Sequence, residues 1–311
     1  MEDLLTISVI LCSYNRATSL EKTLESLRQM SVPPNLKWEL VVVDNNSTDN
    51  TRGVVEEFAR TSGLNVRYMF EPGQGSSRAR NTGVANSTSE IIAFTDDDVE
   101  VSPEWLRELA GAFTEFDCMG VGGRSIPTWN GLCRPDWLIT AGRYRLVSGP
   151  ILDFDLGDQA RELRVAPWGL NMAFRRVAFE KYGLFRTDLG ISGSRRRITG
   201  GDTEFGNRLL RGGEKIVYSP KAVVLHPVVQ LRITKNYFLE YYFCLGRTNV
   251  RQERWPAESV LYFGVPRYLF RELLGNGAQW LVALNRKKKF YYKAQMYHSL
   301  GQIAEALDYT V

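Results

Sequence analysis

Three consecutive carboxylates, Asp96, Asp97 and Asp98, follow an apolar run that begins at Ile91. The run predicts a buried strand, so the three acids are expected where that strand ends. Near a protein surface, two like charges about 4 Å apart repel by roughly 4 kcal/mol, and a cation between them would remove that cost. Such a cation would be a hard divalent metal, which prefers oxygen ligands and can also hold phosphate oxygens. A solvated acidic loop is the alternative, because a short acidic motif alone is a weak signal.

Segments with strand and helix patterns alternate around this motif. Four apolar runs are predicted as strands, at residues 4–11, 40–43, 66–70 and 91–94. Because the connections are short, the alternation implies a mostly parallel, doubly wound sheet. Polar residues follow each predicted strand, at positions 14–16, 44, 71–75 and 96–98. Ligands bind beyond the carboxyl ends of such strands, so the sequence predicts one site at one edge of the sheet.

Local signals predict where two helices start and where further strands lie. Thr18, followed three residues later by Glu21, has the pattern of a capping box. Ser102 is the expected N-cap of a helix whose first residue is Pro103. Two further short strands are predicted at residues 216–218 and 222–225.

Glycine-rich phosphate loops are not found where a nucleotide fold would need them. The first predicted strand lacks the dinucleotide glycine fingerprint, and the chain contains no GxxxxGK[ST] sequence. The sequence GVGGRS at residues 120–125 lacks the last glycine of the GxGxxG fingerprint and is interpreted as a glycine-rich strand end. Phosphate at this site is therefore expected to be held by a metal ion.

Composition limits the function classes. A chain of 311 residues with 44% hydrophobic residues suits a globular protein of one large domain with an appendage, or of two domains. A net charge of +4 is too small to indicate nucleic acid. Four cysteines without CxxC spacing indicate a reducing compartment, and two histidines argue against a zinc site. No signal-peptide pattern and no membrane-spanning apolar run is found, so a cytoplasmic protein is predicted.

Six motifs follow one another along the chain: SVILCSYNR, VVVDNNSTDNT, SSRARNTG, FTDDDVEVSPEWL, WGLNMAFRR and GGDTEFGNRLLRGG. Together, in this order, they resemble family 2 glycosyltransferases of the GT-A fold. The resemblance implies an α/β protein with a GT-A nucleotide-binding fold, a mostly parallel, doubly wound central sheet and a C-terminal helical extension. The expected domains are a catalytic domain at residues 1–230 and a helical extension, rich in aromatic and basic residues, at 231–311.

The resemblance also implies roles for individual residues. Those expected around the nucleotide sugar are Cys12, Tyr14, Arg16, Asp44, Arg80, Asp96 and Asp97. Asp44 would accept a hydrogen bond from a base N–H, and Asp98 would ligate the metal directly. His226 is a further candidate metal ligand, with a hydrogen-bonded core residue as the alternative. Trp168 and Asn171 would line the sugar and acceptor side, and Asp202 would be the catalytic base.

Two positions depart from the family pattern. Many relatives carry an acid directly before the base, whereas this chain has Gly201 there. Relatives also commonly have a DG step after the second strand, where this chain has Asn45 and Asn46. The first departure leaves Asp202 without a neighbouring carboxylate, and the second puts a different turn next to Asp44.

The expected reaction moves a sugar from a nucleotide-diphosphate donor, with uridine favoured, to a hydroxyl of a saccharide or lipid-linked acceptor. Mn²⁺ or Mg²⁺ on Asp98 would act as a Lewis acid on the diphosphate. Asp202 would take the proton of the acceptor hydroxyl, and attack opposite the leaving group would invert the anomeric centre. The arginine-rich stretch 190–201, with Arg195, Arg196 and Arg197, either closes over the anion or is an ordinary exposed loop. The expected process is cell-surface or exopolysaccharide synthesis.

The C-terminal segment differs in composition from the rest of the chain, because it is rich in aromatic and basic residues. Amphipathic helices are predicted with breaks at Pro256, Pro266 and Gly275, and a basic run at residues 286–289 precedes the aromatic residues 290–292. Such a surface can lie on the anionic inner face of a cell membrane. Packing on the protein itself, or in a homodimer, is the alternative.

Two other functions fit parts of the pattern. A magnesium-dependent phosphohydrolase also uses an aspartate at a strand end, but Asp44 and Asp202 would then have no role. An inactive module that only binds a nucleotide sugar is the second alternative. The presence of both Asp98 and Asp202 argues against it.

Overall fold

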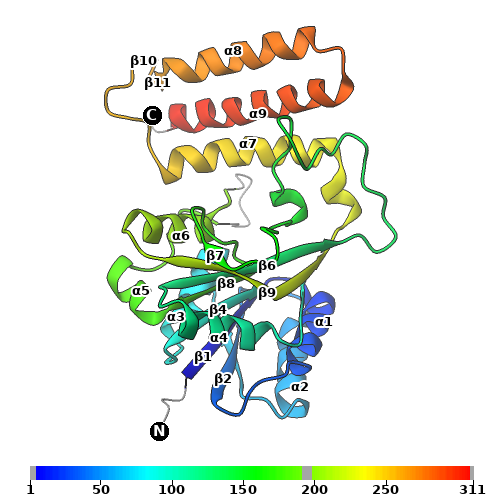
Figure 1. Cartoon of the computed structure of the whole chain (residues 1–311), viewed down its shortest axis with the longest axis vertical. Helices are drawn as coiled ribbons and strands as arrows, with labels where there is room; N and C mark the ends of the chain where they lie inside the picture. The colour runs from blue at the N-terminus through cyan, green and yellow to red at the C-terminus, as the bar shows by residue number, and fades with distance from the viewer. Residues whose placement is uncertain (1–4, 191–197, 309–311) are drawn as a thin grey trace. The chain divides into compact units, whose positions relative to one another are not determined.

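A computed structural model describes residues 5–190 and 198–308 of the chain, which form two compact units (Figure 1). Of these residues, unit 1 takes 5–128, 153–190 and 201–227, and unit 2 takes 129–152, 198–200 and 228–308. Unit 1 ends at Pro227, and the stretch 129–152 belongs to unit 2 although the residues before and after it in the sequence belong to unit 1. The domain boundary after residue 230 stays a prediction. Arg195, Arg196 and Arg197 lie outside the described residues.

Unit 1 is built on a nine-stranded sheet, counted over the described residues, with β7 paired to β9 beside the main path β3-β2-β1-β4-β8-β6-β9-β5. The strands are β1 (Leu5–Ser13), β2 (Leu36–Asp44), β3 (Val66–Phe70), β4 (Ile91–Asp96), β5 (Glu100–Val101), β6 (Gly120–Thr128), β7 (Arg161–Glu162), β8 (Asn171–Arg175) and β9 (Ile216–Pro227). Strands β1 to β4 pair in parallel, as do β6 and β9. Strand β8 runs antiparallel to both β4 and β6. The predicted mostly parallel α/β sheet is therefore confirmed, with β8 as an antiparallel insertion.

Six helices of unit 1 lie within the described residues and connect or cover these strands. They are α1 (Ala17–Arg28), α2 (Thr51–Thr61), α3 (Ser76–Ala85), α4 (Trp105–Glu115), α5 (Arg176–Tyr182) and α6 (Gly201–Arg211). Leu20, Leu24 and Leu27 lie at helical spacing along one face of α1 and are buried. Gly183 ends α5 with a φ of 77°, a conformation that glycine adopts without strain.

Two predicted helix starts are wrong. The capping box at Thr18 does not form, because Thr18 lies inside α1, which begins at Ala17, and the carboxylate of Asp49 accepts the N–H of Ala17 at 2.9 Å. The helix expected from Pro103 starts at Trp105, with Glu104 as its N-cap. The short strand β5 takes up the residues just before it. At α1 the contact from Asp49 replaces the local capping signal, whereas the start of α4 differs from the predicted one by two residues, a shift common at helix ends.

The two strands predicted at residues 216–218 and 222–225 are one continuous strand, β9. Its pairing with β6 shifts register between Gly123 and Arg124, which marks an irregularity of the β-bulge kind. This irregularity explains why the sequence pattern predicts two strands with a break between them. The bulged strand still delivers His226 at its carboxyl end.

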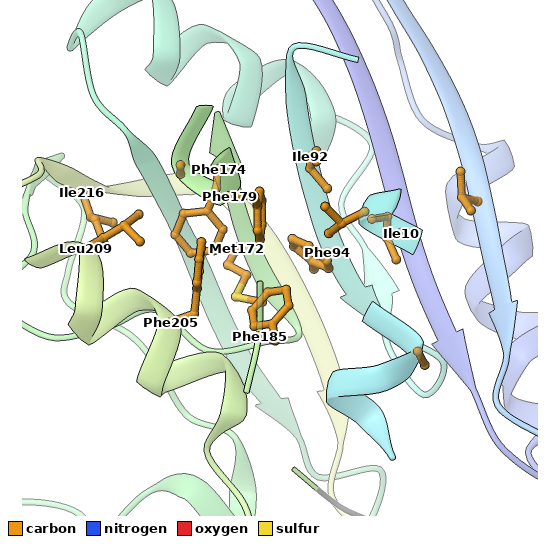
Figure 2. Packing of buried hydrophobic residues seen from close by; sticks show 14 of the residues in the cluster. Ile10, Ile92, Phe94, Met172, Phe174, Phe179, Phe185, Phe205, Leu209 and Ile216 are labelled. Carbon is orange, nitrogen blue, oxygen red and sulfur yellow. The ribbon is translucent and has the colours of Figure 1, made fainter. Parts of the chain in front are cut away.

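An aromatic cluster fixes α6 against the sheet (Figure 2). Phe205 of α6 is fully buried, stacks on Phe179 with ring centroids 4.6 Å apart, and meets Phe174 of β8 edge-on at 5.0 Å. Each such aromatic pair adds about 0.5–1.5 kcal/mol to the area that it buries. Phe205 lies three residues after Asp202 on the same helix, so this cluster sets the position of the Asp202 side chain.

Unit 2 contains three longer helices among its described residues, α7 (Lys235–Gln252), α8 (Arg267–Val282) and α9 (Arg286–Asp308). Figure 1 shows α9 lying between the other two. A two-stranded ribbon, β10 (Leu261–Tyr262) and β11 (Val265–Pro266), precedes α8, and short 3₁₀ turns occur at Gly149–Ile151 and Gln230–Ile233. Gly275 lies inside α8, so the helix break predicted there is wrong, whereas Pro266 does precede the helix as its N-cap.

Helices α7 and α9 approach closely through two glycines. A Cβ atom on Gly246 of α7 would overlap the carbonyl oxygen of His298, and one on Gly301 of α9 would overlap that of Phe243. Next to this crossing, the buried Glu305 of α9 accepts hydrogen bonds from Arg247 at 2.7 Å and from Arg251. The absence of side chains at both glycines therefore lets the helices meet at a distance where this ion cluster forms.

We expect Gly246→Ala to destabilise unit 2 by about 1–3 kcal/mol, because the added methyl group meets backbone that cannot swing away. The matched control is Gly275→Ala in α8, where a Cβ has nothing within 4 Å. Alanine is favoured over glycine in an open helix by about 1 kcal/mol, so the control should raise stability. Urea unfolding followed by far-UV circular dichroism distinguishes the two. Equal shifts for both variants would contradict the close crossing.

Candidate active site

The carboxyl ends of β1, β2 and β4 lie side by side. In the parallel registers, Ser13 of β1 is paired with Asp44 of β2, and Cys12 of β1 is paired with Asp96 of β4. The turn that follows β1 contains Arg16, whose guanidinium reaches the acids after β4. The structure thus brings together polar residues that the sequence places in separate motifs.

The three consecutive acids point to different partners. The carboxylate of Asp96 lies 3.5 Å from the guanidinium of Arg80. Asp97 is buried, accepts a hydrogen bond from the Ser13 hydroxyl at 2.7 Å and lies 3.1 Å from Arg16. Asp98 lies 2.5 Å from the same guanidinium. Two arginine cations and one hydroxyl group therefore separate the three carboxylates and reduce their mutual repulsion.

Burial raises the pKa of two of these carboxyl groups. It raises the pKa of Asp97 to about 6, against the lowering effect of Arg16. Burial also raises the pKa of Asp96, which Arg80 opposes and which Asp98 and Asp202 reinforce. Because Asp98 and Asp202 both affect the pKa of Asp96, the Asp96 carboxylate lies within electrostatic reach of these two acids.

Two further groups keep fixed protonation states. Burial lowers the pKa of Arg16, but the charges of Asp98 and Asp97 outweigh it, so the net shift is upward. Burial raises the pKa of the Cys12 thiol to about 12, against the lowering effect of Arg80. Arg16 is thus a permanent cation, and Cys12 is a neutral thiol that can line a pocket but is not a nucleophile.

His226 and Asp98 form the candidate metal pair. His226, which is 1% exposed, has its Nε2 atom 3.5 Å from Oδ2 of Asp98. Ligand atoms that share an octahedral ion at about 2.1 Å lie about 3 Å apart, so a small side-chain movement would let both reach one cation. In the described part of the chain, no group of three acidic, histidine or cysteine side chains is arranged to hold a metal ion. The pair therefore fits a metal whose other ligands come from phosphate and water.

Asp202 is held by the backbone of the turn before β8. Its Oδ2 atom accepts the Gly169 N–H at 2.6 Å, and Arg80 interacts with its charge. A Cβ on Gly169 would lie 2.7 Å from that same Oδ2 and 2.5 Å from the Arg80 guanidinium. Only a residue without a side chain lets these two groups approach the turn together.

Gly201, which departs from the family pattern, has a packing reason. A Cβ atom at this position would overlap the hydroxyl oxygen of Ser77, whose Oγ donates to the carbonyl of Leu189 at 2.8 Å. An acidic side chain would require α3 and the 189 loop to shift. The missing acid before Asp202 is therefore built into the packing of α6.

Asp44 lies at the end of β2 with both carboxylate oxygens engaged. Oδ1 accepts the Ser47 N–H at 2.9 Å, and Oδ2 accepts the Tyr68 hydroxyl at 2.8 Å. In the turn that follows, Asn46 has a φ of 65°, which asparagine tolerates better than most residues. Asn45 stabilises the turn, since its amide bonds to Gly73 and Gly75. The turn thus works without the glycine that relatives commonly have.

Two cavities open along this edge. One of about 390 Å³ is lined by residues that include Arg16, Lys22 and Asp98. The other, of about 480 Å³, is lined by residues that include Asp44 and Phe70. Both are open to solvent and lie at strand ends, where a ligand of an α/β sheet is expected.

The remaining predicted site residues differ in exposure. Tyr14 is 45% exposed, and Trp168 is partly buried and packs on Phe154 with ring centroids 5.3 Å apart. Asn171 is buried: its carbonyl oxygen accepts the Trp105 indole N–H at 2.8 Å, and its amide nitrogen donates to two backbone carbonyls. These bonds give Asn171 a structural role in tying β8 to its neighbours.

Three residues that hold the site residues in place were not predicted from the sequence. Ser13 and Tyr68 hold Asp97 and Asp44, and Gly169 holds Asp202. Ser13 and Gly169 stand inside motifs already singled out, so their positions carried some signal. Nothing in the sequence around Tyr68 indicates its contact with Asp44, because that contact depends on the register of β2 with β3.

Comparison with known proteins agrees with this arrangement. The sequence profile described as Glycosyl transferase family 2 matches residues 8–183. The chain is 29% identical over 248 residues to the "Succinoglycan biosynthesis protein ExoM" of Rhizobium meliloti (strain 1021), covering 79% of this chain and 75% of that protein. It is 26% identical over 230 residues to a "Glucosyl-dolichyl phosphate glucuronosyltransferase" of Haloferax volcanii, covering 73% and 70%.

A solved structure shares the fold. The mannosyltransferase PcManGT from Pyrobaculum calidifontis, in complex with GDP-Man and Mn²⁺, aligns with a TM-score of 0.62 and 19% identity over 97% of this chain and 87% of that one. Like it, the present chain has the mixed α/β sheet of GT-A glycosyltransferases. The profile match covers more than half of the chain and contains the acids of the β4 edge, so this protein belongs to glycosyl transferase family 2.

Proposed function

We propose that this glycosyltransferase is metal-dependent and inverting, and that it moves a sugar from a nucleotide-diphosphate donor to a hydroxyl of a saccharide or lipid-linked acceptor. One observation carries the proposal. A candidate metal pair, Asp98 and His226, and a candidate base, Asp202, lie within electrostatic reach of one carboxylate. Asp96 is that carboxylate, and its charge interacts with all three side chains.

Asp98 and His226 would hold the divalent cation, with Mn²⁺ or Mg²⁺ favoured by oxygen-rich ligation. When bound, the ion would supply Lewis-acid stabilisation of the leaving diphosphate. The PcManGT structure contains Mn²⁺ together with its donor, which supports a metal of this class. Arg80 and Arg16 would add fixed positive charge beside the same acids.

Asp202 would act as the general base. The Gly169 N–H fixes the orientation of its carboxylate, and the buried Phe205 fixes its helix. Such positioning is what general-base catalysis requires, and it typically contributes about 10²–10⁴-fold. The other nearby acid, Asp96, is paired with Arg80. A single base that activates the acceptor, without a covalent sugar intermediate, inverts the anomeric centre.

The donor would lie across the strand ends, with the nucleoside between the turn after β1 and Asp44. The Tyr14 ring is accessible and would stack on the base. The Cys12 thiol stays protonated and uncharged, and it would line the pocket. Trp168 would border the sugar and acceptor. Uridine is the base favoured by the family resemblance, whereas the PcManGT donor carries guanosine.

The relatives suggest the kind of acceptor and the process. One is named for succinoglycan biosynthesis, and the other for transfer to glucosyl-dolichyl phosphate, a sugar on a lipid carrier. We therefore propose a growing saccharide, free or lipid-linked, in cell-surface or exopolysaccharide synthesis. The four cysteines are all free thiols, which fits a cytoplasmic location.

The family match favours transfer over the phosphohydrolase alternative, in which Asp202 would have no role. A phosphatase assay with a generic phosphate ester should therefore give no turnover above a chelated control. An inactive binding module would differ in another way. It would bind a donor without even slow hydrolysis of the sugar.

A thermal-shift panel of nucleotide-diphosphate sugars, each with Mn²⁺ or with chelator, tests the donor and the metal together. We expect one base to stabilise the chain, because a ligand at about 100 times its Kd adds about 2.7 kcal/mol to the folded state. Chelator should remove most of that shift. Donor stabilisation that chelator leaves unchanged would contradict a metal at Asp98 and His226.

We expect Asp202→Asn to lower kcat by at least about 10²-fold, because the amide cannot take the acceptor proton. Donor affinity should change little, since an amide oxygen can still accept the Gly169 N–H. Asp158→Asn, at a carboxylate that is 84% exposed and pairs with Arg124, is the matched control and should retain activity. Steady-state transfer and donor titration measure the two effects. Normal turnover in the Asp202→Asn variant would disprove the assignment of the base.

Arg16 occupies the acids that a metal would need, so it should compete with the metal when no donor is bound. We expect Arg16→Gln to bind Mn²⁺ alone about three- to tenfold more tightly, a modest gain because the guanidinium is partly exposed. The same variant should bind the donor more weakly in the presence of Mn²⁺. Lys22→Gln removes a charge from the wall of the same cavity and serves as control. Calorimetric Mn²⁺ titration that gives equal affinities for Arg16→Gln and the wild-type chain would rule out the competition.

A further inference from the structure

Unit 2 exposes apolar side chains in a restricted part of its chain. Phe263, in the turn between β10 and β11, is 92% exposed, and Leu284, in the turn between α8 and α9, is fully exposed. Between these turns, Leu274, Leu281 and Val282 of α8 are each about 70% exposed. A soluble surface carries single apolar residues without consequence, but several along one helix and both of its ends call for an explanation.

Basic residues accompany this apolar surface. Arg267 and Arg271 are exposed on α8, and Arg286, Lys287 and Lys288 are exposed at the start of α9. From residue 260 to residue 289 the sequence contains six basic residues and a single acidic one, Glu272. We call these exposed apolar and basic residues the α8 surface. Its charge is predominantly of one sign.

The internal packing of unit 2 uses other side chains. Leu269 of α8 is buried in a small cluster with Val265 and Ala306. The aromatic residues next to the basic run also pack inward: Phe290 lies against Trp137 with ring centroids 4.9 Å apart, and Tyr291 lies against Tyr144 at 5.5 Å. These contacts make the two aromatic residues part of the internal packing of unit 2. The α8 surface remains outside this packing.

A lipid surface and a second copy of the chain are the two occupants to compare. In a two-fold dimer the same patch meets itself, so the basic residues of both copies would be brought together with few acidic partners in the patch. An anionic membrane instead complements both parts, because its headgroups attract the basic residues while its acyl boundary accepts the apolar ones. Charge complementarity therefore favours the membrane.

The depth of the contact is limited. Among residues 5–190 and 198–308, no helix combines the length and the apolar character that crossing a bilayer requires. A helix of 16 residues is about 24 Å long and can lie in the plane of the interface. The exposed apolar side chains at both of its ends would enter the boundary between headgroups and acyl chains.

We propose that the α8 surface binds anionic membranes, with α8 lying in the interfacial plane and the turns at Phe263 and Leu284 as apolar anchors. Arg286, Lys287 and Lys288 interact with the lipid headgroups beside the second anchor. This placement is independent of the sugar-transfer reaction, and it goes beyond it by assigning a surface of unit 2 to a lipid partner.

Co-sedimentation of the full chain with vesicles tests the proposal. We expect binding to vesicles of phosphatidylcholine with phosphatidylglycerol, little binding to phosphatidylcholine alone, and release at high salt. Arg286→Gln with Lys287→Gln should weaken binding by about 25-fold, because each basic residue near an anionic surface contributes about fivefold. Lys22→Gln with Lys37→Gln, two exposed lysines of unit 1, is the charge-matched control and should bind like the wild-type chain.

The apolar anchors have their own matched pair. Leu281→Ser with Leu284→Ser should weaken vesicle binding by at least about tenfold. Val229→Ser with Leu231→Ser removes exposed apolar residues elsewhere in unit 2, where Leu231 is 69% exposed, and should not. All four altered residues are exposed, so thermal unfolding and donor binding should be unchanged.

Two outcomes would overturn the proposal. One is a wild-type chain that does not bind anionic vesicles at low salt. The other is a dimer, seen by light scattering, that Leu281→Ser with Leu284→Ser converts to a monomer, which would assign the α8 surface to a second copy of the chain. Neither result depends on whether the chain transfers a sugar, so the failure of this proposal is distinguishable from failure of the proposed reaction.

Discussion

The repulsion among Asp96, Asp97 and Asp98 is the constraint on which the site depends. Three adjacent carboxylates at a strand end are stable because each one faces its own set of groups: Asp96 faces Arg80, Asp97 faces Ser13 and Arg16, and Asp98 faces Arg16 and His226. This separation requires the parallel register of β1 with β4, because the turn after β1 supplies Arg16 and the end of β1 supplies Ser13. The sheet therefore does more than carry the acids. It sets which cation each acid can reach.

The same reasoning extends to Asp202, which belongs to a distant part of the sequence. Arg80 interacts with both Asp96 and Asp202, and the turn at Gly169 comes close enough to donate its N–H to Asp202 only because it has no side chain. The aromatic contacts of Phe205 hold the helix that presents this carboxylate. An enlarged residue at Gly169 would separate the arginine from the acid, so the position of one glycine decides whether the two halves of the site are connected.

Much of the fold and the convergence of the site could be predicted from local pattern, and the failures have physical causes. Apolar runs that end in polar turns identified β1 to β4, since a buried parallel strand leaves a strong compositional signal. The capping box at Thr18 failed because Asp49 reaches across to Ala17, and a contact from far along the chain overrides local propensity. The partners of the site residues failed in the same way. Tyr68 bonds to Asp44 through strand register, and nothing within either motif indicates the other.

The charged residues of the two units differ in their surroundings and in how strongly salt screens them. In unit 1, Arg16 and Arg80 lie at 2.5–3.5 Å from acids whose side chains are 7–35% exposed, so mobile ions screen these short pairs less than they screen charges on an open surface. In unit 2, the basic residues of α8 and of the start of α9 are exposed in a stretch with a single acid, so their field extends into solvent and falls within about 10 Å at moderate salt. The first arrangement organises a site at short range. The second suits a large, charged surface, because no single small anion could contact basic residues that lie near both ends of α8.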